Sequence, residues 1–243
     1  DKFKDYHRKG KTRDLYDLSS NKMLITATDR ISSFDKVFGA VPLKGNILHK
    51  ITNFWFNYTK DIVTNHIVDS TNENILKVSK FDVYPVEVIV RGYITGTTDT
   101  SLWTLYKNGV KNPYGLTLPK GLTLNDQLPE PVITPTTKAE YGKHDEVLTE
   151  KEIISGKFVP SEKWKDIKGY SWDLIRNISL RLFKRGQAVA KEAGLILVDT
   201  KYEFGYKNGM IFLIDEIHTT DSSRYWLEED YKNGTITNYD KEF

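Results

Sequence analysis

The chain has 243 residues, with 35 Lys and Arg against 33 Asp and Glu and no cysteine. Nearly balanced charge gives no reason to expect nucleic acid or an anionic membrane as a partner, and the lack of cysteine excludes disulfides, thiolate metal sites and a cysteine nucleophile. No apolar run approaches the roughly 20 residues that span a bilayer, so we expect a soluble, cytoplasmic protein. The length suits one large domain or two small lobes around a cleft. Because the first residue is Asp1 rather than Met, we expect a short leader to be missing.

A basic turn precedes the first predicted hairpin. Residues 9–13 read Lys-Gly-Lys-Thr-Arg, and the strand-like segments 14–18 and 23–28 follow. A glycine between lysines lets backbone N–H groups approach a polyphosphate while the ammonium groups neutralise its charge. An ordinary basic loop would have the same composition. Residues 27–35, Ala-Thr-Asp-Arg-Ile-Ser-Ser-Phe-Asp, then predict either a ligand-contacting loop or a turn whose Asp and Ser satisfy their own backbone.

Apolar residues at helical spacing predict a helix over residues 45–58. They are Ile47, Leu48, Ile51, Phe54, Trp55 and Tyr58. We expect the whole stripe to pack in the core. A strand is predicted over residues 83–94, where Val86, Val88 and Val90 alternate with other positions. A strand that links two lobes can offer backbone groups to an adenine edge, with Glu87 accepting from the amino group; a plain strand with a Glu87–Arg91 ion pair is the alternative.

The middle of the chain is irregular and then rigid. Residues 100–128 are rich in Gly, Pro and Asn, with one short amphipathic piece at 103–106. Three prolines within residues 128–140 then fix an extended path. Side chains held on this loop can contact anionic substrate groups, or else lie in solvent. They are Thr136, Thr137, Lys138, His144, Asp145 and Glu146.

Two helices are predicted before the last strands. Thr149 and Glu152 fit a capping box that begins a short helix. Ser171 is the predicted cap of a longer helix that runs to Gly194 and packs on the sheet.

The last hairpin concentrates charge. Apolar segments 195–198 and 210–214 flank Lys207-Asn208-Gly209, a typical tight turn. Asp199, Lys201 and Glu203 share a strand face, and pairing can bring Asp215 across from them. Crowded carboxylates suit Mg²⁺ with substrate phosphates. A solvated hairpin with cross-strand ion pairs is the alternative, as is a simple Asp199–Lys201 pair that orders the strand.

Two hydroxyls beside a guanidinium follow the hairpin. Asp221-Ser222-Ser223-Arg224 has the composition of a phosphate or carboxylate cradle.

These segments together resemble one family. The motifs are GKTRDLY at 10–16, ATDRISSFD at 27–35, PVEVIVRGY at 85–93, TPTTKAEYGKHDE at 134–146, and DTKYEFG with IDEIHTTDSSRYW at 199–226. They are similar to those of phosphoribosylaminoimidazole-succinocarboxamide synthases, or SAICAR synthetases, in the same order. Thr97 stands where the family usually has Ser, and Thr220 where it usually has Pro. Lys44 of the Lys-Gly step before the predicted helix also matches.

The resemblance implies an α+β, two-lobed fold with ATP in a cleft between the lobes. The lobes expected are residues 1–85, β-rich with the glycine-rich phosphate loop, and residues 86–243, with the substrate and magnesium sites. The implied reaction is the ATP-dependent joining of L-aspartate to carboxyaminoimidazole ribotide in purine biosynthesis. The resemblance also implies that the partners are small-molecule substrates with Mg²⁺, and that no nucleic acid or membrane is bound. A homo-oligomer is possible.

The implied site residues fall into four groups. Catalysis is assigned to Asp199, as the group that deprotonates the aspartate amine, and to Lys201. ATP binding is assigned to Gly10, Lys11, Arg13, Val86, Glu87 and Val88, and the metal to Glu203 and Asp215. Substrate binding is assigned to Arg30, Ser32, Ser33, Asp35, Arg91, Thr97, Lys138, His144, Asp145, Asp221, Ser222, Ser223 and Arg224.

Two other functions use the same residue types. A small-molecule or inositol-phosphate kinase would share the glycine-rich loop and the magnesium carboxylates. An inactive ATP-binding module would share them too.

Overall fold

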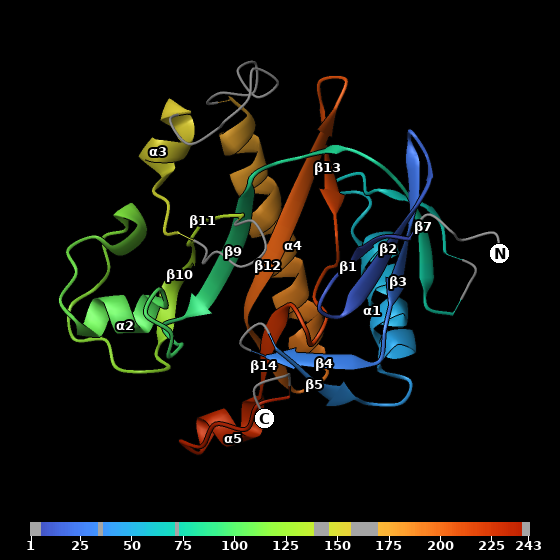
Figure 1. The fold of residues 1–243 in the computed structure, drawn as a ribbon. Coiled ribbons are helices and arrows are strands. Elements are labelled where there is room, and N and C mark those ends of the chain that lie inside the picture. Colours follow the sequence, from blue (N-terminus) through green and yellow to red (C-terminus); the bar gives the residue numbers. More distant parts are fainter. Residues whose placement is uncertain (1–5, 34–35, 71–72, 139–145, 157–169, 240–243) are drawn as a thin grey trace. The chain divides into compact units, whose positions relative to one another are not determined.

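The computed structural model describes residues 6–33, 36–70, 73–138, 146–156 and 170–239. The fold is α+β, and the chain divides into two compact units (Figure 1). The first unit is Asp1–Val83 with Gly205–Ser222, and the second is Tyr84–Phe204 with Ser223–Phe243. The chain passes from the first unit to the second after Val83, returns to the first at Gly205 and enters the second again at Ser223. Residues 205–222, expected in the second lobe, belong to the first unit, because β13 bonds to the segment after α1 through Leu213 N and Thr64 O at 2.9 Å.

The first unit contains a five-stranded antiparallel sheet in the order β1-β2-β3-β7-β6. Its strands are β1 (Tyr6–Lys9), β2 (Arg13–Ser19), β3 (Lys22–Ala27), β6 (Ile67–Asp69) and β7 (Ile75–Ser79). Ile25, Leu76 and Val78 form the buried face of this sheet. The unit also contains β4 (Arg30–Ser33) paired with β5 (Lys36–Ala40), β8 (Asp82–Val83) and β13 (Met210–Ile214). The predicted strands 14–18 and 23–28 are therefore confirmed.

Helix α1 (Lys44–Tyr58) confirms the predicted helix but only part of its core. Leu48 and Trp55 are buried, whereas Ile47, Phe54 and Tyr58 are each about half exposed. The expectation that the whole stripe packs in the core is therefore wrong, because apolar residues cover more than the single face that α1 buries.

The start of α1 lies close to β3. Asp29 holds it, since Gly45 N donates to Asp29 Oδ1 at 2.9 Å. A Cβ atom at Gly45 would lie 2.5 Å from the Ala27 carbonyl oxygen, so only glycine fits there.

The second unit is built around β9 (Val86–Tyr93). β9 pairs with β10 (Gln127–Ile133) and β11 (Thr136–Thr137) on one edge and with β12 (Leu195–Lys207) on the other. β14 (Ser223–Leu227) continues this sheet beside β12. The long helix α4 (Tyr170–Glu192) runs along these strands, with Phe183 close to Gly92 of β9 (Figure 1). The remaining helices are α2 (Leu102–Lys107), η1 (Pro113–Gly115), α3 (Glu150–Ser155) and α5 (Glu228–Lys232).

Several local predictions can be checked directly. Asn208 and Gly209 have positive φ angles of 52° and 79° between β12 and β13, as the hairpin turn requires. Thr149 and Glu152 form the predicted capping box of α3. Ser171 lies inside α4, which begins at Tyr170, so its prediction as the cap is wrong. Within the described ranges, none of the helices has the length and apolar character needed to cross a membrane.

Candidate active site

The basic turn at residues 10–13 is closed by its own backbone. Gly10 N donates to the Arg13 carbonyl oxygen at 2.7 Å. A Cβ atom at Gly10 would lie 2.6 Å from that same oxygen, so a side chain there would open the turn. The glycine is therefore required by close backbone approach, and the turn delivers Arg13 to the start of β2.

Residues of the Ala-Thr-Asp-Arg segment hold this turn. Arg30 Nη2 donates to the Gly10 carbonyl at 3.0 Å and Arg30 Nε to the Lys11 carbonyl at 2.9 Å. The same guanidinium forms two hydrogen bonds with Asp14, at 2.6 and 3.2 Å. Arg30, expected to bind substrate, thus directs its guanidinium at the turn.

Arg13 joins the turn to the end of β13. Its guanidinium lies 2.6 Å from Asp215 Oδ1 and donates to Glu216 Oε1 at 2.9 Å. Glu216 also accepts from Thr219 Oγ1 at 2.5 Å. Burial raises the pKa of Glu216, the Arg13 charge opposes that rise, and Asp215 adds to it. This group of Arg13, Asp215 and Glu216 is called the Arg13 cluster below.

A small cavity of about 20 Å³ adjoins the Arg13 cluster. His49 and Asp221 line it together with members of the cluster. His49 is buried, which lowers its pKa, and its Nδ1 has no hydrogen-bond partner among the residues that the structure describes. Lys44 Nζ donates to Asp221 Oδ2 at 2.6 Å, so Asp221 is an ion-pair partner as well as a predicted substrate residue.

The loop after Asp215 is conformationally unusual. Asp215 and His218 have φ angles of 71° and 54°, in the left-handed region that non-glycine residues rarely adopt. His218 is buried and packs on Trp55 with the two rings nearly perpendicular, at 87°, and their centroids 4.4 Å apart. Burial lowers the pKa of His218 to about 3. A neutral imidazole on Trp55 therefore supports the loop that presents Asp215.

In the second unit, Asp199 lies between two arginines. Its Oδ2 accepts from Arg91 Nη1 at 2.8 Å and from Arg224 Nη1 at 2.6 Å. Both arginines lie directly opposite Asp199 in the strand register, Arg91 on β9 and Arg224 on β14. Arg91 Nε also donates to Thr134 Oγ1 at 2.8 Å, and Asp199 is only 5% exposed. These three charged residues are called the Asp199 cluster.

Lys201 pairs with glutamates instead of with Asp199. Its Nζ donates to Glu87 Oε1 at 2.9 Å and to Glu203 Oε1 at 2.8 Å, so the alternative of an Asp199–Lys201 pair is wrong. Lys138 Nζ donates to the other oxygen of Glu203. Burial alone would raise the pKa of Glu203, but Lys201 and Lys138 together hold it below its ordinary value. The four side chains form a row of alternating charge.

At residues 86–88, where an adenine-binding role is expected, β9 is paired on both sides of the sheet as follows. Glu87 pairs with Thr136 and Val86 with Thr137 on one edge of the strand, and Val88 pairs with Tyr202 on the other. The register with β12 covers Val88 to Arg91, whereas Val86 and Glu87 pair with β11, and the role of these residues in binding adenine stays a prediction. Glu87 directs its carboxylate to Lys201. The strand that the alternating apolar residues predicted is confirmed.

The other predicted residues are distributed as follows. Ser32 and Ser33 lie on β4, paired with Val37 and Lys36 of β5. Thr97 is exposed just after β9. Ser222 is 3.1 Å from Thr219 between their hydroxyl oxygens, and Ser223 is 2.8 Å from Thr200. Asp35, His144 and Asp145 lie outside the described residues.

Some contributors were missed from the sequence. Thr134, Glu216 and Thr219 each bond a charged site residue but were not predicted to do so. Glu216 adjoins the predicted Asp215, and Thr134 begins the Thr-Pro-Thr-Thr-Lys motif. Closeness in sequence to predicted residues was therefore the only feature that could have indicated these two.

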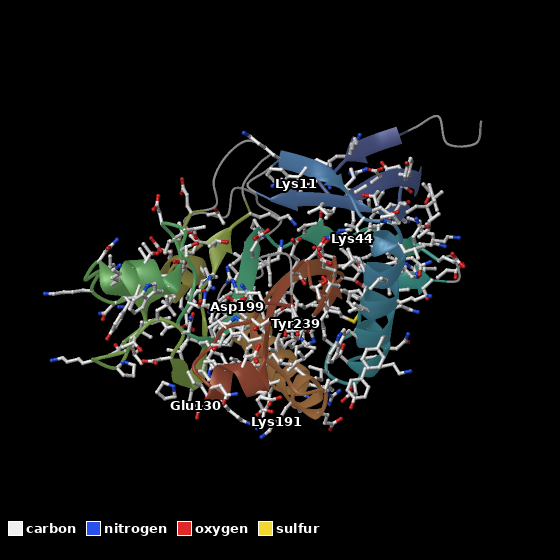
Figure 2. The ribbon with its side chains drawn as sticks, turned by 90° about the horizontal axis from the view of Figure 1, so that it is seen from below. Lys11, Lys44, Glu130, Lys191, Asp199 and Tyr239 are labelled. Atoms are coloured by element: carbon white, nitrogen blue, oxygen red, sulfur yellow. The ribbon has the colours of Figure 1, made fainter. Side chains whose placement is uncertain are left out.

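The two predicted metal ligands lie in different units, Glu203 in the second and Asp215 in the first. Each is an oxygen donor of the type that Mg²⁺ prefers, and each contacts basic side chains. Considering only the part of the chain that the structure describes, no three His, Cys, Asp or Glu residues converge as a preformed metal site. In Figure 2, Lys11 and Lys44 mark the first unit, and Asp199 lies among the interior side chains of the second.

The sequence of this chain is similar to those of known proteins. The family model described as SAICAR synthetase matches residues 6–243. The phosphoribosylaminoimidazole-succinocarboxamide synthase of Legionella pneumophila strain Lens is 46% identical over 241 residues, which cover 97% of this chain and 74% of that one.

Solved structures of proteins with the same family name are similar to this chain in fold. SAICAR synthase from Saccharomyces cerevisiae in complex with SAICAR has a TM-score of 0.76 and 31% identity, over 94% of this chain and 77% of that one. A SAICAR synthetase in complex with ADP has a TM-score of 0.75 and 26% identity, over 97% and 88%. The chain therefore belongs to the SAICAR synthetase family.

Proposed function

We propose that the Arg13 cluster serves the phosphates and magnesium ion of ATP, and that the Asp199 cluster binds an anionic group of the ribotide. The reaction of the family joins L-aspartate to carboxyaminoimidazole ribotide, with ATP yielding ADP and phosphate. ATP activates the ribotide carboxylate as an acyl phosphate, and the aspartate amine then displaces phosphate. Such chemistry depends on positioned phosphates and neutralised charge more than on a protein nucleophile.

The observation that carries this proposal is the position of Asp199 between two arginines. One carboxylate and two guanidiniums leave an excess positive charge in a largely buried place. A planar guanidinium fork binds phosphate and carboxylate oxygens in two-point contacts. The Asp199 cluster is thus suited to an oxyanion, and we assign the ribotide phosphate or carboxylate to Arg224 and Arg91 with Ser222 and Ser223.

The ATP assignment follows from the first unit. Gly10, Lys11 and Arg13 offer a tight turn and two basic side chains to the polyphosphate. The adenine is assigned to Val86, Glu87 and Val88 of β9. The Arg13 cluster has two carboxylates and one guanidinium, so it suits a cation better than an anion. Magnesium would be held by Asp215 and Glu203, and when bound it would neutralise charge on the phosphate oxygens.

Asp199 and Lys201 carry the proposed chemical roles. The amine of aspartate has a reference pKa above 7 and must lose a proton before it attacks. Asp199 is the proposed acceptor, although its Oδ2 already receives two arginine hydrogen bonds. Lys201, fixed between Glu87 and Glu203, steadies the transferring phosphoryl group. The remaining substrate contacts are assigned to Ser32, Ser33, Asp35, Thr97, Lys138, His144, Asp145 and Asp221.

Incubation with ATP, the ribotide and L-aspartate tests the function. Mass spectrometry should detect the succinocarboxamide ribotide only when all three substrates and Mg²⁺ are present. A phosphorylated ribotide that accumulates regardless of aspartate would favour the kinase alternative. No ADP formation would favour the inactive module. Light scattering and cell fractionation would test the proposed homo-oligomer and cytoplasmic location.

A further inference from the structure

The guanidinium of Arg30 holds the backbone of the basic turn. Three consecutive carbonyls of that turn are bound by the segment after β3. Arg30 binds those of Gly10 and Lys11, at 3.0 and 2.9 Å. The Thr12 carbonyl accepts from both Thr28 N at 2.9 Å and Thr28 Oγ1 at 2.7 Å. The turn is therefore held at every carbonyl from residue 10 to 12.

This arrangement sets the direction of the amides. In a trans peptide the C=O and N–H of one unit point in opposite directions. When Arg30 binds the carbonyls of Gly10 and Lys11, the N–H groups of Lys11 and Thr12 turn to the opposite side. Successive N–H groups on one side of a turn form a concave site for anions. Arg30 thus orients the amides without itself facing the anion.

Asp14 completes the support. Its two oxygens receive Arg30 Nη2 at 2.6 Å and Nη1 at 3.2 Å, and the two side chains are only 15–18% exposed. Four hydrogen bonds therefore fix one guanidinium against two carbonyls and one carboxylate. A lysine ammonium at this position has one nitrogen and cannot reproduce that fork.

We propose that Arg30, held by Asp14, is a positioning residue that fixes the 10–13 turn for the triphosphate of ATP. The proposal rests on the proposed function of the turn in binding ATP. It gives Arg30 a role different from direct contact with the ribotide. The prediction is a selective effect on ATP.

The test compares Arg30→Lys and Arg30→Met with wild type. Both should raise the KM for ATP about tenfold or more and leave the KM for the ribotide within about twofold. Amide hydrogen exchange of residues 10–13 without ATP should become faster in both variants. Arg8→Lys is the matched control, because Arg8 is exposed on β1, close to the turn in sequence, and should change neither value. Thermal unfolding establishes that each variant is folded.

A gentler variant covers the case in which Arg30 variants do not fold. Thr28→Val removes the hydroxyl bond to the Thr12 carbonyl and keeps the backbone bond. It should raise the KM for ATP by a smaller factor, about threefold, and speed exchange at the same amides. No change in either quantity would overturn the proposal.

The other outcomes are also distinct. A rise in the ribotide KM alone would mean that Arg30 contacts the ribotide. If Arg30→Lys had normal ATP kinetics and Arg30→Met did not, only the charge of Arg30 would matter. Either result overturns the positioning role. Gly10→Ala distinguishes failure of the proposed function of the turn from failure of the proposed role of Arg30. If it leaves the KM for ATP unchanged, the proposed function of the turn fails; if it raises that KM while Arg30→Lys does not, only the role of Arg30 fails.

Discussion

The Arg13 cluster and the Asp199 cluster are opposite arrangements of the same residue types. In the first unit one guanidinium faces two carboxylates, and in the second unit one carboxylate faces two guanidiniums. The first arrangement has an excess of negative charge and the second an excess of positive charge. Local charge balance therefore supports the proposed cation binding at the first cluster and the proposed oxyanion binding at the second, although each contains an Arg–Asp ion pair.

The two clusters also differ in how they are built. Asp199, Arg91 and Arg224 lie opposite one another on three neighbouring strands, so the sheet itself fixes their positions. Asp215 and Glu216 lie at the end of β13, where Asp215 has a left-handed backbone and a loop rests on His218. We therefore expect the Asp199 cluster to be the more rigid of the two. The geometry of the Arg13 cluster should change more with solution conditions such as pH.

The largest expected effect is that of Asp199→Asn. Loss of the charge between two arginines should destabilise the fold by about 3 kcal/mol, because it leaves buried guanidiniums uncompensated. It should also lower kcat at least about 100-fold if Asp199 accepts the proton of the amine. Urea unfolding and steady-state kinetics measure both effects.

The pH profile of Asp199→Asn separates its two roles. If Asp199 is the proton acceptor, activity should recover in part as pH rises and free amine accumulates. A loss that stays flat between about pH 7 and 9.5 would leave Asp199 only the role of holding Arg91 and Arg224.

The second prediction concerns the cation preference of the Arg13 cluster. Asp215→Asn should raise the Mg²⁺ concentration for half-maximal activity about 10-fold or more, with a smaller effect on folding. Activity titrated against Mg²⁺ at fixed ATP provides the measurement. Near-normal activity at limiting Mg²⁺ would contradict the assignment of Asp215.

Arg224→Lys sharpens the oxyanion assignment. An ammonium keeps the charge but loses the planar fork, so the KM for the ribotide should rise about tenfold, equivalent to about 1.4 kcal/mol. The KM for ATP should change little. An unchanged ribotide KM would place the anion elsewhere.

The effect that is smallest at neutral pH is the acid sensitivity of the first unit. The pKa of His218 is about 3 in the folded protein against 6.5 ordinarily, so between these values the unfolded chain binds a proton that the folded chain does not. Stability should therefore fall as pH drops below about 6.5, by at most about 1.4 kcal/mol per pH unit. Urea unfolding between pH 7 and 5 measures this slope. His218→Phe, which keeps a ring on Trp55, should reduce it, and an identical slope would exclude His218 as the cause.

Local structure was predictable where short-range rules apply. The Asn208-Gly209 turn and the Thr149–Glu152 capping box depend on neighbouring residues, and both are found. Residues two apart on a strand share a face, and this spacing on β12 indicated Asp199 and Lys201 as candidate site residues. Motif resemblance identified the family.

Partner choice was not predictable, because neighbouring strands determine it. The sequence places Lys201 nearest to Asp199, yet β9 and β14 bring arginines from positions 91 and 224 directly opposite Asp199. The same limitation applies to Glu87, whose carboxylate pairs with Lys201 of a neighbouring strand. The exposed face of α1 was missed because apolar spacing alone does not show how much of a helix its neighbours cover.

The close approach of backbone at Gly10 and Gly45 has a consequence for sequence variation. Gly10 lies against the Arg13 carbonyl and Gly45 against that of Ala27, residues that face each other on β2 and β3. A saturation library at either position should recover only glycine under selection for purine prototrophy. At Gly39, where an added Cβ meets no atom within 4 Å and φ is not in the left-handed region, many residues should survive. The backbone of the β2–β3 pair would then restrict the sequence at Gly10 and Gly45, which lie outside the strands themselves.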